Sequence, residues 1–332
     1  MQPIRTGAML RILGAALVAA ATTALALTAP VLAQAFPDKP ITVIVPSAAG
    51  GPADVSARLI GERMSALLGQ QLVIEAVPGA GGTIGMARVA RAAPDGYTLM
   101  VHQNGFAITP TLYEKLSFDT AKDFTTVGLV NQSYVILVGR EDLPAKTFAE
   151  LKAWMLGPGK PAKYAHPGAG TLGHLQTLML VKALGVEASV ISYRGIAPAV
   201  NDLLGKHIDL ANVGAAVASR HIAAGKLKGY AVGATKRIAG LPDVPTFGEV
   251  GSKELERPFW HALFAPAATP QPVVAKLYLS LRKALSNESV RERYRGMGVE
   301  IIDMSQSEFD AYVRADFDKW RRVAREGNIV VE

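Results

Sequence analysis

The sequence predicts an α/β protein of two domains. The chain has 332 residues, which is long enough for two domains of ordinary size. Hydrophobic residues make up 49% of it and charged residues 19%, as is typical of a globular protein with large cores. In addition, one design of strand, glycine-rich loop and helix occurs three times along the chain.

The first of these segments covers residues 41–60 and reads ITVIVPSAAGGPADVSARLI. Its β-branched run is typical of a strand that is buried on both faces of a parallel sheet. Gly50 and Gly51 allow the backbone to turn, and Pro52 suits the first turn of a helix, which needs no N–H there. Because such a loop leaves free N–H groups at a helix N-terminus, the segment predicts an anion site.

The other two segments cover residues 72–93 and 163–181, with the loops PGAGG and PGAGTLG. Any one of the three could be an ordinary turn that packs a helix onto a sheet. Because the design is repeated, the sequence favours a cleft that is lined by the N-termini of helices.

The first half of the chain alternates between strands and helices. A strand at residues 71–75 and the loop at 78–82 precede a helix at about 83–92, and a turn at 94–96 leads to a strand at 97–101. These βαβ steps predict a parallel sheet, and ligands bind at the carboxyl ends of such strands. The third strand ends in polar or small residues at that edge, namely His102, Gln103, Asn104 and Gly105.

Two segments break the alternation and are predicted to cross between the domains. Residues 127–138 read as one or two strands with no helix between them, and residues 259–266 read as the return crossing. We therefore expect a first domain of residues 36–134 and 259–332, and a second domain of residues 135–258.

The second domain is expected to repeat the plan of the first. Its predicted strands cover residues 164–165, 190–193, 208–210 (ending at Asn212) and 227–232, and its predicted helices cover residues 148–156, 172–183, 198–204 and 216–224.

Two helices are predicted after the return crossing. Thr269 as N-cap and Pro270 as first helical residue start one that ends near residue 285. Ser305 starts the last helix, and Glu308 completes its capping box. Its apolar residues at helical spacing are predicted to be core: Phe309, Tyr312, Val313, Phe317, Trp320 and Val323.

The first 35 residues have the pattern of a secretory signal peptide. Arg5 and Arg11 precede an apolar stretch, and motifs of small residues predict cleavage near Ala33–Phe36. An N-terminal membrane anchor is the alternative. Removal of the two arginines lowers the net charge from +7 to +5. Since no dense run of Lys and Arg exists, this charge favours anionic small molecules as partners and argues against nucleic acid.

The sequence offers little for catalysis. It contains no Cys, which excludes disulfides, thiol catalysis, thiolate metal sites and a lipid-modified cysteine. Its six histidines lack metal-site spacing, and neither Gly-x-Ser-x-Gly nor His-Glu-x-x-His occurs. One alternative is an NADP-dependent oxidoreductase, since Gly168–Gly173 reads G-x-G-x-x-G and Arg194 could meet the 2′-phosphate. That fingerprint follows a poor strand in mid-chain, so we expect no enzyme, no metal and no cofactor.

The mature chain resembles, from end to end, the exported substrate-binding proteins of tripartite tricarboxylate transporters, the Bug or TctC family. The resemblance is carried, in the family's order and spacing, by PDKPITVIVPSAAGGPADVSAR, PGAGGTIGMARVARAAPDGYTL, YRGIAPAVNDLLGKHIDL, HIAAGKLKGYAV, LPDVPTFGEVG and FAPAATP. It implies a periplasmic-binding-protein fold (type II-like), whose two domains close on a ligand about hinge strands.

The resemblance also implies a function. The protein would be a periplasmic, monomeric receptor that captures a small carboxylate-type solute for the membrane subunits of a transporter. A ligand sensor for a signalling partner is an alternative that the sequence leaves open. In the family, two loops of the first domain hold one carboxylate, partly through water, and loops of the second domain hold the other end.

Carried onto this chain, the family pattern and the strand-end residues give the predicted ligand-binding set. In the first domain it comprises Ser47, Ala49, Gly50, Gly51, Asp54, Gly79, Gly81, Gly82 and Gln103. In the second domain it comprises His166, Gly170, Thr171, His174, Arg194, Gly195 and Asn212.

Several departures from the family pattern bear on the ligand. Ser47 replaces a usual aromatic, Ala76-Val77 replaces Asn-Arg, His166-Pro167 replaces Ser-Ala, and Thr171 replaces a common serine. Val213 stands where the family commonly has an aspartate that could meet an amino group. We therefore expect a dicarboxylate without an amine, or an aromatic acid, rather than an amino acid.

Overall fold

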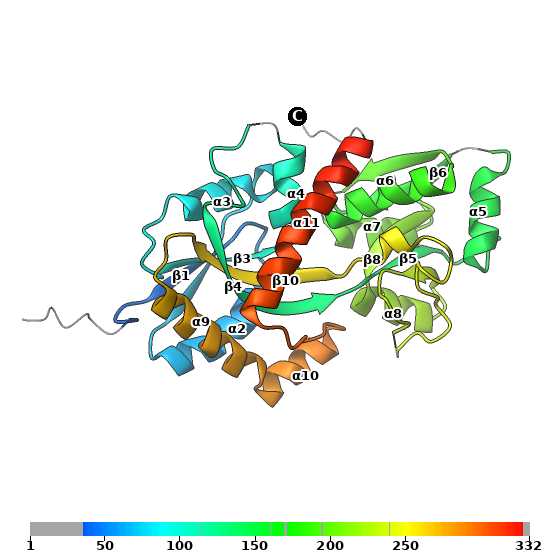
Figure 1. Cartoon of the computed structure of the whole chain (residues 1–332). Coiled ribbons are helices and arrows are strands. Elements are labelled where there is room, and N and C mark those ends of the chain that lie inside the picture. Colours follow the sequence, from blue (N-terminus) through cyan, green and yellow to red (C-terminus); the bar gives the residue numbers. More distant parts are fainter. Residues whose placement is uncertain are drawn as a thin grey trace, which may run out of the picture. The chain divides into compact units, whose positions relative to one another are not determined.

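The computed structural model describes residues 36–113, 115–159, 161–168, 171–193, 195–238 and 240–327. The predicted signal peptide thus lies outside the described residues. From Lys39 onward the chain forms one compact unit, which contains two sheets of five strands each (Figure 1).

The first sheet has the strand order β2-β1-β3-β10-β4. As predicted, β1 (Ile41–Val45) pairs in parallel with β2 (Leu72–Ala76) and with β3 (Thr98–Gln103). The sheet as a whole is mixed, because β10 (Phe259–Pro266) is antiparallel to both β3 and β4 (Phe124–Ser133).

The second sheet has the order β7-β6-β8-β5-β9 and follows the same plan. Its parallel strands are β6 (Ala162–His166), β7 (Ala188–Ser192) and β8 (Leu210–Gly214). β5 (Val135–Arg140) is antiparallel to β8 and to β9 (Leu227–Val232). In each sheet, the parallel strand that comes second in the chain (β2 or β7) lies at one edge. The fourth strand across each sheet (β10 or β5) is antiparallel to its neighbours and is a crossing strand between the sheets.

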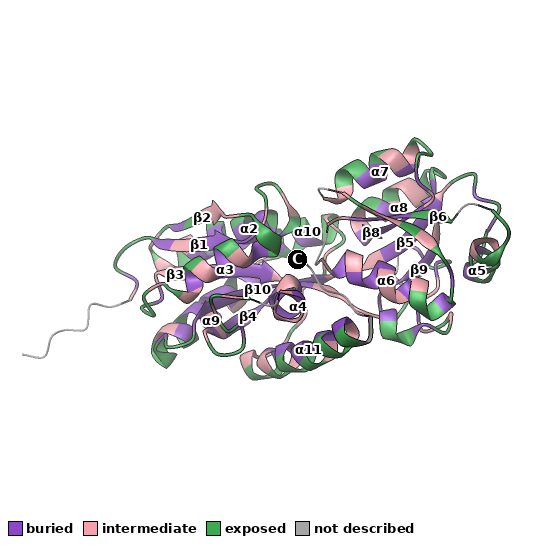
Figure 2. Ribbon diagram, turned by 90° about the horizontal axis from the view of Figure 1, so that it is seen from above, coloured by how far each residue is buried: buried purple, intermediate pink, exposed green. Residues whose placement is uncertain are grey.

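Helices flank both sheets, and Figure 2 shows that their exposed residues lie mostly on the sides facing away from the strands. Those of the first sheet are α2 (Pro52–Leu68), α3 (Thr83–Ala90), α4 (Gly105–Leu112), α9 (Gln271–Leu285), α10 (Glu288–Gly296) and α11 (Gln306–Gly327). Those of the second are α5 (Phe148–Leu156), α6 (Leu172–Leu184), α7 (Ile196–Leu204) and α8 (Ala215–Ala223). Two short 3₁₀ turns, η1 (Ala80–Gly82) and η2 (Lys253–Leu255), complete the described elements.

The sequence expectations were wrong for the strength of β6, for the start of β8 and for the N-cap of α9. The strand before the third glycine loop is not poor, since β6 has five residues and four of them are buried. β8 begins at Leu210 rather than at Ile208, whose side chain packs in the core before the strand starts. The N-cap of α9 is Pro270 rather than Thr269, because Pro270 keeps an extended ψ of 136° and its carbonyl accepts from Val274 N.

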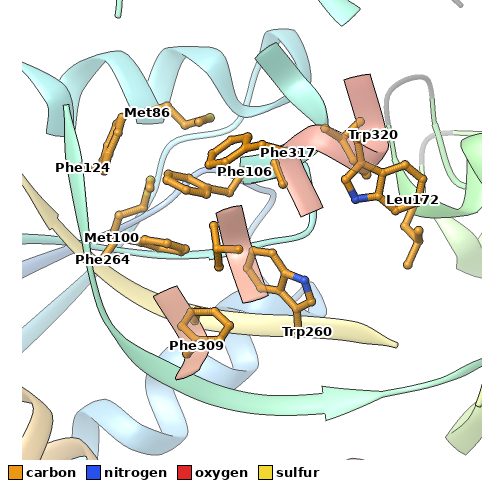
Figure 3. Packing of buried hydrophobic residues seen from close by; sticks show 14 of the residues in the cluster. Met86, Met100, Phe106, Phe124, Leu172, Trp260, Phe264, Phe309, Phe317 and Trp320 are labelled. Carbon is orange, nitrogen blue, oxygen red and sulfur yellow. The ribbon is translucent and has the colours of Figure 1, made fainter. Parts of the chain in front are cut away.

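The largest core cluster belongs to the first sheet and is rich in aromatic rings (Figure 3). Phe106 of α4 stacks on Phe264 of β10 with ring centroids 4.0 Å apart. The predicted apolar face of α11 is confirmed, with Phe309 and Trp320 fully buried. The cluster also takes in Leu172 from the first turn of α6, so α11 joins the helices of both sheets.

The chain passes from the first sheet to the second between Ser133 and Val135, and it returns through Pro258. The return is held by Asn104, which is buried directly after β3. Its amide nitrogen donates to Pro258 O (3.2 Å), and its amide oxygen accepts from Trp260 N (2.9 Å). One side chain therefore fixes the backbone of the return crossing.

Candidate ligand-binding site

The first glycine loop follows β1 and is shaped by a carboxylate of the helix that comes after it. Gly50 has a φ of +76°, a conformation that glycine adopts readily. Gly51 is the N-cap of α2, and Pro52 is in the first turn of the helix, as predicted. Asp54 in the first turn of α2 accepts from Gly50 N at 2.9 Å. Ala49 and Gly50 are exposed, while Ser47 and Gly51 are half-buried.

Asp54 is itself held by a residue that the sequence reasoning missed. The side chain of Asp54 is 3% exposed, and Arg58 donates to both of its oxygens at 2.9 Å. The hydrogen bond from Arg58 is the main reason that the pKa of Asp54 lies below its usual value. The i, i+4 spacing of the two residues was the signal that could have found this pair.

The second glycine loop lies against Pro46, the residue that precedes the first. Gly79, Gly81 and Gly82 all have positive φ values, of +129°, +64° and +99°. A Cβ on the buried Gly82 would lie 3.1 Å from Pro46 O, and one on Gly81 would lie 2.5 Å from the hydroxyl of Tyr113. The loop therefore needs glycine for its backbone angles and for its close approach to Pro46. Tyr113 is a further residue beside the loop, and the sequence analysis did not name it.

The end of β3 lies beneath these loops. The imidazole of His102 is 3.2 Å from where a Cβ of Gly82 would be, and the residue is 2% exposed. Burial lowers the pKa of His102 to about 3, so the ring is neutral at pH 7 and brings no positive charge. Gln103, the next residue, is half-buried and pairs with His261 across the sheet.

In the second sheet, the ends of β6 and β7 meet in a similar way. His166 O accepts from Tyr193 N and Pro167 O accepts from Gly195 N, each at 3.0 Å. Gly195 has a φ of +102° and is the N-cap of α7. Gly170 and Arg194, two predicted site residues, lie outside the described residues.

Helix α6 begins at a side-chain cap. The hydroxyl of Thr171 accepts from His174 N (3.2 Å) and donates to Gly168 O (2.7 Å). The rings of His166 and His174 stack with centroids 4.2 Å apart and an interplanar angle of 26°. The structure thus brings together His166, Thr171 and His174 at the N-terminus of one helix.

Asn212 lies in the interior of the second sheet rather than beside a loop. Its amide oxygen accepts from the Tyr164 hydroxyl (3.0 Å), and its amide nitrogen donates to the Thr177 hydroxyl (3.1 Å) and to Gly173 O (3.4 Å). These bonds fix the first turns of α6 against β6 and β8. As a direct ligand contact, Asn212 stays a prediction.

Other features of the described residues do not point to a different site. No group of three or more His, Asp or Glu side chains among them could hold a metal ion. A small crevice lies between α4, α11 and residues 120–126, and none of the predicted site residues lines it. Within the described chain, no helix combines the length and the apolar character needed to span a bilayer.

Two mixed sheets of one plan, joined by crossing strands and with glycine loops at their carboxyl ends, define the class of periplasmic solute-binding proteins. The periplasmic binding protein BugD has this fold with a TM-score of 0.79 and 37% identity, over 90% of this chain and 100% of BugD. A sequence model of the tripartite tricarboxylate transporter family receptor matches residues 56–329, and the chain belongs to that family. The resemblance and the two-domain fold stated from the sequence are confirmed.

Two further members of this structural group were solved with a carboxylate. MatC from Rhodopseudomonas palustris, with bound malate, is 34% identical over 87% of this chain and 99% of MatC, with a TM-score of 0.78. Rpa4515 from the same species, with adipate, is 30% identical over 89% of this chain and 99% of that protein, with a TM-score of 0.79. Since the family consists of substrate-binding proteins, the oxidoreductase alternative is not favoured.

Proposed function

We propose that this protein is a periplasmic receptor that captures a small carboxylate and delivers it to the membrane subunits of a tripartite transporter. The observation that carries the proposal is that two glycine loops, Ser47–Gly51 and Gly79–Gly82, follow the adjacent parallel strands β1 and β2, and that Gly82 of the second approaches Pro46, the residue before the first. Both loops lead into helix N-termini, where partial positive charge and free N–H groups favour an anion. The malate and adipate bound by relatives support a carboxylate in particular.

The two halves of the site would close on the ligand. We propose that residues 36–134 with 259–332, and residues 135–258, move as two domains about the crossings at Tyr134 and Pro258. Each charge-assisted hydrogen bond contributes about 1.5–3 kcal/mol, and a helix N-terminus about 0.3–1 kcal/mol. A few such contacts reach roughly −8 kcal/mol, which corresponds to a micromolar dissociation constant.

The binding step is tested by thermal unfolding of the signal-free protein with a panel of carboxylates and amino acids. A ligand at 100 times its dissociation constant adds about 2.7 kcal/mol of stability, which raises the midpoint by several degrees. We expect carboxylates without an amino group to raise the midpoint more than amino acids do. The proposal fails if no carboxylate shifts it and mass spectrometry of the denatured protein finds no co-purified carboxylate.

Export and transport need experiments in cells. We expect the protein in the periplasmic fraction, with an N-terminus near Ala33–Phe36 after cleavage of the signal. Uptake of the bound carboxylate should be lost when the gene is deleted, and it should be restored by the wild-type protein but not by a Gly82→Val variant that is exported at normal levels. Restored uptake by the binding-deficient variant would contradict the transport role.

A further inference from the structure

Helix α11 packs against the return crossing through charged as well as aromatic side chains. Asp316 of α11 accepts a hydrogen bond from Trp260 Nε1 at 3.2 Å, and its other carboxylate oxygen is 3.9 Å from Lys319 Nζ. The same Nζ lies 4.4 Å from the centre of the Trp320 ring, within range of a cation–π contact. We call this group of side chains the polar seam: Arg257, Trp260, Asp316, Lys319 and Trp320.

The polar seam lies where the first sheet, the return crossing and a helix of the second sheet meet. Arg257 directly precedes Pro258, through which the chain returns to the first sheet. Trp320 is fully buried and belongs to the same core cluster as Leu172 and Leu175 of α6, and Figure 3 shows its indole beside Leu172. A change in the seam therefore acts on the connection between the two halves of the chain.

The seam buries charged groups that the described residues do not satisfy. The side chains of Asp316 and Lys319 are 8% and 17% exposed. Nζ of Lys319 and Nε of Arg257 are buried, and neither forms a hydrogen bond within the described part of the chain. Both groups are donors only, so they cannot satisfy each other. Because a buried donor without a partner is unfavourable, the seam would gain hydrogen bonds if water entered it.

The protonation of the seam depends on this burial. Burial raises the pKa of Asp316, and burial together with the positive charge of Arg257 lowers the pKa of Lys319 to about 7, against the opposing effect of Asp316. Burial also raises the pKa of Tyr312 on α11 and, to about 12, that of Tyr134 at the first crossing. Among the described residues, no titratable side chain of α6 contributes to the shift at Lys319.

We propose that the polar seam is the contact that opens to water when the two domains move, and that the charge on Lys319 sets how readily it opens. The inference rests on the domain closure of the proposed function. A seam of apolar side chains would hold α11 to the return crossing more firmly, since replacement of a buried ion pair by apolar residues is often neutral or stabilising. A charged seam instead keeps this connection ready to separate.

The direction of the pH dependence follows from linkage. Lys319 has a pKa of about 7 in the closed seam, whereas a lysine in water has a pKa of about 10.4. Between these values the open seam binds more protons, so lowering the pH favours opening. The ratio of open to closed seam rises up to tenfold for each pH unit of this decrease. Below about pH 7 Lys319 is charged in both states, and its contribution no longer changes.

The first test is tryptophan fluorescence of the mature protein between pH 7 and pH 9.5. The chain has three tryptophans, so the change Trp154→Phe leaves only Trp260 and Trp320, both in the seam. Because opening hydrates these indoles, we expect their emission to move to longer wavelength as the pH is lowered from 9.5 to 7. The double variant Asp316→Asn/Lys319→Met should keep the short-wavelength emission at both pH values, and Lys319→Arg should give the long-wavelength emission at both.

The second test measures the distance between the proposed domains by spin labels. The absence of native Cys allows labels at Arg63→Cys on α2 and Asn201→Cys on α7, two exposed positions. We expect the distance distribution to broaden as the pH is lowered, and to stay narrow in the double variant. Lys283→Met, which changes an exposed lysine of α9, is the matched control and should keep the wild-type response to pH. Circular dichroism checks that each variant is folded.

Measurements with malate and adipate separate this inference from the receptor function. Emission or distances that do not change with pH, or a pH response that the double variant retains, overturn the role of the polar seam. If malate or adipate still changes the distances in that case, the proposed receptor function stands. Distances that respond to no carboxylate of the panel overturn the proposed domain closure, and the role of the seam with it.

Discussion

The carboxylate of Asp54 accepts a hydrogen bond from the backbone N–H of Gly50 at 2.9 Å, four residues earlier in the chain. The loop that leads into the N-terminus of α2 thus already has an internal carboxylate at one of its own N–H groups. The loop gains a fixed shape from this bond, and a ligand would meet it through the other exposed backbone groups. The first glycine loop is in this sense preorganised by its own helix.

Removal of this carboxylate should destabilise the loop more than removal of its salt-bridge partner. Asp54→Ala leaves the Gly50 N–H without its acceptor and should cost about 1–3 kcal/mol in free energy of unfolding. Arg58→Ala should cost less than about 1 kcal/mol, because the Arg58 side chain is 55% exposed. Urea unfolding of both variants measures the difference, with Asp243→Asn, at an exposed position, as control. Equal losses in the two variants would show that the ion pair, and not the bond to the loop, is the important contact.

The close contact between Gly82 and Pro46 predicts a strong effect of substitution at Gly82. Alanine at Gly82 must adopt a φ of +99° and also approach Pro46 O, whereas alanine at Gly69, the C-cap of α2, meets only the cost of its φ of +71°. We expect Gly69→Ala to cost about 1–2 kcal/mol in stability with no change in carboxylate affinity. Gly82→Ala should cost more and should also weaken carboxylate binding. Equal effects of the two variants on affinity would contradict the placement of the site at this loop.

Local patterns in the sequence predicted those parts of the fold that depend on nearby residues. The β-branched run of β1, the capping box at Ser305 and the apolar face of α11 are all confirmed. Helices α4 and α10 were missed because their local signals are weak. Helix α4 contains Pro110, and α10 is mostly polar with two buried residues, Val290 and Tyr294.

What the sequence could not predict are contacts between residues far apart in the chain. Asn104 was noticed only as one of several polar residues after a strand, yet its partners Pro258 and Trp260 lie more than 150 positions away. The bonds of Asn212 to α6 depend on which strands pair, and no local pattern encodes that pairing. The individual site residues therefore remain predictions, although the loops that carry them are in place.

The two hydrogen bonds from the Asn104 side chain to the return crossing should be important for stability. Asn104→Ala leaves two backbone groups, Pro258 O and Trp260 N, without their partners in a buried region. An unsatisfied buried group costs about 1–3 kcal/mol, so we expect a loss of at least about 2 kcal/mol in chemical unfolding. Asn201→Ala on the exposed side of α7 is the matched control and should change stability by less than about 0.5 kcal/mol. A similar loss of stability in both variants would contradict the role of the Asn104 side chain in fixing the return crossing.

Two buried histidines predict a loss of stability in acid. His102 and His261 lie on the neighbouring strands β3 and β10 and are each 2% exposed, and burial lowers the pKa of each to about 3. An unfolded histidine has a pKa of about 6.5, so between these values the unfolded state binds more protons. The free energy of unfolding therefore falls as the pH drops below about 6.5, by up to roughly 1.4 kcal/mol per pH unit for each histidine.

Urea unfolding between pH 4.5 and 7.5 measures this slope. Other buried histidines contribute in the same window, so the comparison between variants is decisive. We expect His261→Gln and His102→Gln each to reduce the pH slope, and His221→Gln to leave it unchanged. An unaltered slope in both core variants would show that these rings titrate normally in the folded protein.

The cap of α6 allows the structural and the binding roles of one hydroxyl to be separated. Thr171 caps α6 at the predicted site, and Thr147 caps α5 away from it by the same kind of bond, a 3.2 Å contact from the backbone N–H three residues on. Replacement of either residue by alanine should cost about 0.5–2 kcal/mol in stability. Only Thr171→Ala should also weaken carboxylate binding, because Thr171 holds the loop between His166 and His174 through its bond to Gly168 O. Thr171→Ser should restore both properties. If Thr147→Ala and Thr171→Ala lower the affinity to the same extent, the effect is one of global stability and Thr171 has no special place in the site.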